Sequence, residues 1–124
     1  APNQLSFGQR KRVAIAGAVA MRPRVLLLDE ATAGLDPRAV TDLLDTLTAL
    51  TQAGTSVVLA THDVDVAWTW SQETVILAGG SVRRGRTHDL LCDDGLLTSA
   101  RLTVPWGAAV SRRLQRTVLR PDQI

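Results

Sequence analysis

Two adjacent carboxylates, Asp29 and Glu30, directly follow the apolar run Val25 to Leu28. Such a run is typical of a buried strand, and successive side chains of a strand point to opposite sides. The two acids can therefore do different jobs. One could hold Mg²⁺, directly or through a water, while the next orients and deprotonates an attacking water. The alternative is a strand that ends at the surface with two solvated acids.

His62 follows a second apolar run, Ser56 to Ala60, and stands beside Asp63. A histidine at the end of a buried strand could hydrogen-bond a phosphate and so report its presence. The alternative is a structural histidine whose ring nitrogens are satisfied within the fold. His88 is expected to be a surface residue near a helix start, and the three tryptophans are expected to pack rather than to bind a cofactor.

The segment Ser6 to Gln9 has the pattern of a capping box, with serine at the N-cap and glutamine three positions later. A helix N-terminus offers unpaired N–H groups and a partial positive charge, and Gly8 would let a phosphate approach the backbone. Basic residues 10–12 oppose the helix dipole, and a nearby anion would offset that cost. The alternative is an ordinary capped helix with a solvated basic face.

The elements that must position these residues alternate between helix and strand. We expect a buried helix from Ser6 to about Met21, strands over residues 24–29 and 56–60, and a helix from Asp36 to Gly54. The continuous apolar strands indicate a parallel sheet covered on both faces. In such sheets, ligands bind beyond the carboxyl ends of the strands, where the acids and His62 stand.

The rest of the chain predicts smaller elements. A short helix follows His62, and residues 74–85 read as a hairpin through Gly79-Gly80. Residues 87–101 are expected to form two short helices broken near Gly95. The predicted fold is α/β, with a layered, mostly parallel sheet, flanking helices and a C-terminal hairpin. Residues 102–124 carry several arginines and little apolar rhythm, which indicates a solvated face.

Composition limits the possible function classes. The 124 residues are 45% hydrophobic, which argues against disorder, and a net charge of +2 gives no reason to expect a nucleic-acid partner. Cys92 is the only cysteine, so an internal disulfide or a multi-cysteine metal site is excluded. The longest apolar run, residues 13–21, is far below the roughly 20 residues that span a bilayer. Any membrane link is expected through a partner.

The motifs stand in a specific order: LSFGQ at 5–9, VLLLDE at 25–30, AGLD at 33–36 and THD at 61–63. In this order and spacing they resemble the signature motif, Walker B, D-loop and switch histidine of the ABC ATPase family. The fold this implies is the C-terminal part of a P-loop NTPase domain. The resemblance assigns residues 1–101 to that domain and leaves residues 102–124 as a basic tail.

The resemblance also implies a reaction, the hydrolysis of ATP with Mg²⁺. By position, Glu30 is expected to be the general base and Asp29 to serve Mg²⁺ through a water. His62 is expected to contact the γ-phosphate.

Other residues are expected to act across a head-to-tail dimer with a second ABC ATPase subunit. Ser6, Gly8 and Gln9 would touch the ATP bound by the opposite subunit, and Asp36 would help to couple the two sites. The sequence departs from the family at Phe7, where the signature usually has a glycine, and at Ala31, where proline is usual.

A phosphate-binding loop of the form G-x-x-x-x-G-K-[ST] does not occur in residues 1–124, since Lys11 is the only lysine and follows Arg10. We therefore expect that the first half of the domain is missing, and that residues 1–124 alone neither hold ATP tightly nor hydrolyse it.

Within the family, residues 10–14, 32–37 and 61–65 look most like ATPases of cobalt and energy-coupling-factor importers. This implies membrane permease partners and a place on the cytoplasmic face of the cell membrane. Two alternatives stay open. One is a non-catalytic remnant that binds a partner, and the other is an ABC ATPase of the DNA-repair type, which needs coiled-coil arms.

Overall fold

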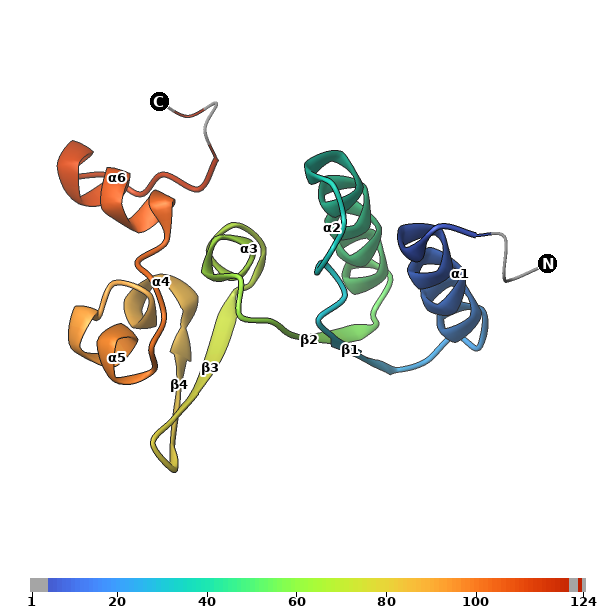
Figure 1. Ribbon diagram of the computed structural model, residues 1–124, viewed down its shortest axis with the longest axis horizontal. Helices are drawn as coiled ribbons and strands as arrows, with labels where there is room; N and C mark the ends of the chain where they lie inside the picture. Colours follow the sequence, from blue (N-terminus) through green and yellow to red (C-terminus); the bar gives the residue numbers. More distant parts are fainter. Residues whose placement is uncertain (1–4, 121–122, 124) are drawn as a thin grey trace. The chain divides into compact units, whose positions relative to one another are not determined.

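The computed structural model describes residues 5–120 and 123, which divide into two compact units at Thr61/His62 (Figure 1). The first contains α1 (Phe7–Ala20), β1 (Val25–Asp29), α2 (Pro37–Gln52) and β2 (Ser56–Ala60). The second contains α3 (Val64–Trp70), β3 (Glu73–Ala78), β4 (Ser81–Arg86), α4 (Thr87–Leu90), α5 (Asp94–Ser99) and α6 (Trp106–Leu114). The predicted order of elements is confirmed up to α5.

The centre of the first unit is a β1–α2–β2 unit. The two strands pair in parallel, with Val25 opposite Ser56 and Asp29 opposite Ala60, so their carboxyl ends meet at one edge. As predicted, Asp36 caps α2, and Gly54 follows its end with a φ of 95°. The Asp36 cap marks the end of the turn that follows Asp29 and Glu30.

The prediction that this sheet is covered on both faces is wrong for the described residues. Leu26 is 5% exposed on the face that also carries Leu28, but Leu27 and Val58 on the other face are 72% and 55% exposed. The apolar runs identify strands correctly, yet only the α2 side of the sheet has a covering layer here. The runs alone could not show what lies over each face.

The helix α1 has the predicted capping box but not the predicted burial. Its body is small and apolar, yet most of its residues are exposed, including Val13 at 59%. The reason is that no neighbouring element among the described residues packs along its length. None of the described helices has the length and apolar character needed to span a membrane.

The second unit is organised around Trp68, which is 2% exposed and packs with Ile76, Leu91, Leu97 and Ala108. The predicted hairpin is present, because β3 and β4 pair antiparallel through Gly79-Gly80. Trp68 is a packing residue, as expected.

Two details of this unit differ from the sequence analysis. The break between α4 and α5 falls before Asp93, whose carboxylate caps α5, and Gly95 lies inside that helix. His88 is half-buried rather than at the surface, with its ring 4.5 Å from that of Trp68. Asp93 is an effective N-cap, and this outweighs the tendency of glycine to interrupt a helix.

Residues 102–120 contain the helix α6, which the sequence analysis did not expect. The indole N–H of Trp68 donates to the carbonyl of Val118 at 2.9 Å, and the backbone N–H of Trp106 donates to Asp65 at 2.8 Å. Val118 itself is fully buried. This segment is thus part of the second unit's packing, while Arg113, like its neighbouring arginines, is exposed.

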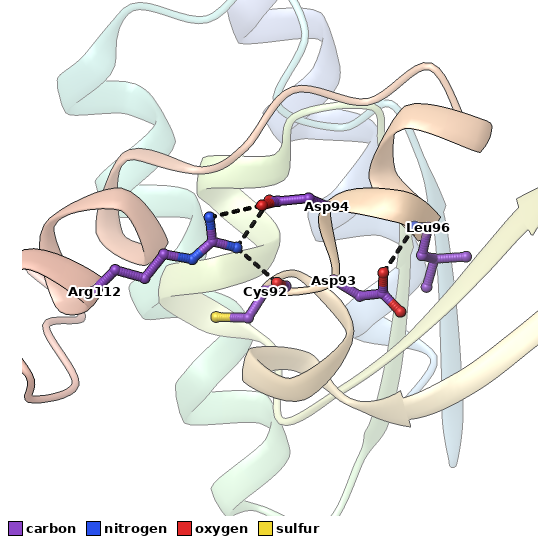
Figure 2. Close-up of polar contacts among 5 residues, drawn as sticks. All are labelled: Cys92, Asp93, Asp94, Leu96 and Arg112. Atoms are coloured by element: carbon purple, nitrogen blue, oxygen red, sulfur yellow. Dashed lines mark hydrogen bonds and ion pairs between the residues drawn. The ribbon is translucent and has the colours of Figure 1, made fainter.

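Arg112 connects α6 to the start of α5 (Figure 2). Its guanidinium donates to both carboxylate oxygens of Asp94, at 3.1 and 2.8 Å, and to the carbonyl of Cys92 at 2.6 Å. The hydrogen bond from Arg112 lowers the pKa of Asp94 below its ordinary value. The pair is exposed, so its role is to fix geometry more than to add stability.

The close approach of α6 to Trp68 yields a stability prediction. A Cβ at Gly107 would lie 2.1 Å from Nε1 of Trp68, so Gly107→Ala must displace the indole. We expect this change to lower the free energy of unfolding by about 1–3 kcal/mol, the usual cost of overpacking. Gly95→Ala is the control, because its Cβ meets only Asp93 at 3.4 Å. Equal denaturation midpoints for the two variants would contradict the packing.

The Arg112–Asp94 pair yields a pH prediction. A carboxylate whose pKa is lowered in the folded state stabilises the protein above its ordinary pKa, and this contribution is lost as the pH falls through the lowered value. Arg112→Gln should return the pKa of Asp94 to its ordinary range. An NMR titration of the Asp94 carboxyl carbon measures this, with Arg113→Gln as the control. The prediction fails if both variants titrate alike.

Candidate functional site

The two acids at the end of β1 lie in different surroundings. Asp29 is the last residue of the strand and is exposed, whereas Glu30 is partly buried and one of its carboxylate oxygens is fully buried. The N–H of Glu30 donates to the carbonyl of Ala60 at 2.9 Å, which extends the parallel ladder by one residue. The two neighbouring carboxylates therefore differ, since that of Asp29 is exposed and that of Glu30 is partly buried.

The chain turns sharply directly after the sheet. Glu30 has a φ of 46°, in the left-handed region that residues with a side chain rarely adopt. The turn is closed by hydrogen bonds from Ala33 to Glu30 and from Leu35 to Thr32, both at 3.2 Å. It ends at Asp36, whose carboxylate accepts the N–H of Ala39 at 2.9 Å.

The start of α1 lies against this turn. Ser6 and Gln9 form the reciprocal capping box, in which the Ser6 N–H donates to the Gln9 side chain at 2.8 Å and the Gln9 N–H donates to the Ser6 hydroxyl at 3.3 Å. A Cβ on Gly8 would come within 3.1 Å of Leu35. Glycine at this position thus permits close packing of the helix start on the turn, a reason that the sequence did not reveal.

Lys11 is a residue of this region that sequence reasoning did not select. Its ammonium group donates to the carbonyls of Glu30 and Ala33, at 2.6 and 2.7 Å. The only signal in the sequence was that Lys11 is the single lysine of the chain. Nothing local predicts its contacts, because they join residues about twenty positions apart.

His62 begins the second unit, is exposed, and lies in the short loop between the end of β2 and the start of α3. Its neighbour Asp63 caps α3 by accepting the N–H groups of Asp65 and Val66, at 3.0 and 3.1 Å. The predicted residues of the first unit are Ser6, Gly8, Gln9, Asp29, Glu30 and Asp36. The contacts of Gly8 with Leu35 and of Lys11 with Glu30 join the start of α1 to the turn after β1. His62 belongs to the second unit.

Comparison with known proteins agrees with these motifs. Residues 1–66 match a family described as "AAA domain, putative AbiEii toxin, Type IV TA system". The chain is 54% identical, over 95% of its length, to a Streptomyces coelicolor protein named "putative ABC transporter ATP-binding protein". It is 36% identical, over 93% of its length, to an energy-coupling factor transporter ATP-binding protein of Methanosphaera stadtmanae. In both cases it spans 42% of the relative's length, less than half.

The fold is likewise similar to solved structures of ABC ATPase domains. One is cbiO1 of Clostridium perfringens, described as part of the ABC transporter complex cbiONQ. It is 34% identical with a TM-score of 0.65, over 90% of this chain and 45% of that one. The sequence motifs, the parallel β1–α2–β2 unit and these similarities agree: the chain belongs to the family of ABC transporter ATP-binding proteins, which have the P-loop NTPase fold.

Proposed function

We propose that this chain is the C-terminal part of the ATP-binding and hydrolysing subunit of an ABC importer. The observation that carries the proposal is the Asp29-Glu30 pair at the carboxyl end of a parallel strand, beside the capped start of α1. Parallel α/β sheets bind ligands at this edge. The proposal assigns the chemistry to these acids and phosphate recognition to the helix start.

In the proposed reaction, Glu30 orients and deprotonates the water that attacks the γ-phosphate of ATP. Partial burial suits this task, because a fixed carboxylate loses little freedom when it positions the water.

Asp29 suits the cation. Among residues 5–120 and 123, no group of three or more histidines, cysteines or acids gathers that could hold a metal. Mg²⁺ does not need one, since it usually binds through one or two carboxylates together with phosphate oxygens and waters. When bound, Mg²⁺ would neutralise charge on the phosphates. The exposed carboxylate of Asp29 would hold it, through a water.

The remaining assignments follow from the family. Ser6, Gly8 and Gln9 would face the ATP of a second ABC ATPase subunit in a head-to-tail dimer, and Asp36 would help to couple the two sites. His62 would donate to the γ-phosphate. The exposed positions of Ser6, Gln9 and His62 leave these residues accessible to a partner or a nucleotide.

The type of transporter is proposed from similarity alone. The relatives include an energy-coupling factor ATP-binding protein and a component of cbiONQ. We therefore favour import of a metal such as cobalt, or of a vitamin, with membrane permease subunits as partners and the ATPase on the cytoplasmic face. The permeases, rather than this chain, would select the substrate.

A second candidate is a non-catalytic, partner-binding half-domain. It is favoured by one observation, the absence of a phosphate-binding loop from residues 1–124. The presence of Asp29 and Glu30 counts against it, because a remnant has no need of a general base.

Replacing the general base tests the proposed reaction. In the native ATPase, purified with its permease, Glu30→Gln should lower kcat for ATP hydrolysis by about 10²- to 10⁴-fold, the usual contribution of general-base catalysis. ATP binding, measured by equilibrium titration, should persist because the amide keeps the shape of the side chain. Asp45→Asn, an exposed acid on α2, is the control and should retain full turnover. Normal turnover by Glu30→Gln would refute the assignment.

The phosphate loop is tested with residues 1–124 alone. Without that loop we expect no ATP hydrolysis above background and no saturable ATP binding at millimolar nucleotide. Phosphate release and calorimetric titration measure the two properties, and circular dichroism checks that the peptide is folded. Turnover that Glu30→Gln abolishes would show that this part of the chain is sufficient, against the proposal.

A further inference from the structure

Lys11 joins the start of α1 to the turn that follows β1. Its ammonium group lies 2.6 Å from the Glu30 carbonyl oxygen and 2.7 Å from that of Ala33. Both contacts are partly buried, so they are shielded from competing water. Hydrogen bonds from a charged donor are shorter and stronger than those between neutral groups.

The neighbouring cations of the helix do not share this role. Arg10 is exposed and donates to Leu5, at the helix's own start, and Arg12 is exposed. A lysine suits the task because its ammonium is compact and carries three donors on a flexible stem. The one ammonium group can therefore donate to both carbonyl oxygens.

The turn that Lys11 holds is the one that aims Glu30. The left-handed backbone at Glu30 is unfavourable for a residue with a side chain and persists only where surrounding contacts determine it. The ladder bond to Ala60 fixes the N–H side of this residue, and its carbonyl oxygen accepts from the Ala33 N–H at 3.2 Å and from Lys11 at 2.6 Å. Without Lys11, only the longer bond from Ala33 would hold this carbonyl, so the peptide could rotate more freely and the carboxylate would move with it.

We propose that Lys11 is a positioning residue for the general base. It holds Glu30 and the 30–35 turn against α1, so that the proposed phosphate-recognition helix and the proposed catalytic acid move as one body. The packing of Gly8 on Leu35 supports this independently. The inference deepens the proposed function, on which its catalytic part rests.

Amide hydrogen exchange in the native protein tests the geometry without reference to activity. Lys11→Met should speed exchange of the peptide over residues 31–36 about tenfold or more, because the loss of hydrogen bonds to a charged group loosens the turn. Arg12→Met removes the same charge from the same helix and should leave this exchange unchanged. Equal exchange in both variants would overturn the proposal.

A second variant guards against misfolding. Lys11→Gln keeps a side-chain donor and should give exchange between those of the native protein and Lys11→Met. If Lys11→Met does not fold, Lys11→Gln carries the test. Faster exchange than in Arg12→Met supports the proposal, and exchange equal to the native protein overturns it.

Steady-state kinetics then tests the effect on catalysis. In the native complex, Lys11→Met should lower kcat about tenfold and leave KM for ATP within about twofold, because the lysine acts on Glu30 and not on nucleotide binding. Arg12→Met should match the native enzyme. A rise in KM with unchanged kcat would overturn the positioning role. A native complex whose turnover resists Glu30→Gln would refute the proposed function instead, while the exchange result would still decide the role of Lys11.

Discussion

The backbone of Glu30 is the constraint on which the candidate site depends. The strand has to end and the chain has to turn within a few residues, and it does so with a φ of 46° at a residue that carries a side chain. Such conformations cost about 1–3 kcal/mol and require support from the surrounding fold. Here the support comes from the neighbouring strand through Ala60 and from the helix α1 through Lys11. These hydrogen bonds therefore hold the sheet, the turn and the start of α1 together.

Local chemistry made a large part of the fold predictable. The capping box of Ser6 and Gln9, the Asp36 cap with its following proline, and the glycine turn at residues 79–80 each specify a structure through contacts within four residues. The apolar runs before Asp29 and Thr61 predict strands from a similarly short stretch of sequence. The positions of the two acids at a sheet edge followed from these signals.

The features that could not be predicted all depend on distant partners. An apolar run shows that a strand can be buried but not which faces are covered, so the exposure of Leu27 and Val58 came only from the structure. Lys11 carried no motif, because carbonyl groups of a distant turn leave no trace in the residues around it. The helix α6 was missed for a related reason. Its glycine is required by the tryptophan that it packs on rather than by its own propensity.

The hydrogen bonds of the helix start also limit how it could recognise a phosphate. The Ser6 hydroxyl accepts the Gln9 N–H, the Gln9 side-chain oxygen accepts the Ser6 N–H, and the N–H of Arg10 bonds to the Ser6 carbonyl. These hydrogen bonds do not use the backbone N–H groups of Phe7 and Gly8 or the side-chain amide nitrogen of Gln9. In the proposed function, these donors bind the phosphate. A backbone donor is present whatever the side chain, so the family's usual glycine at position 7 is not needed to supply it. At Gly8 the situation differs, because a side chain there would press on Leu35 and disturb the turn that aims Glu30.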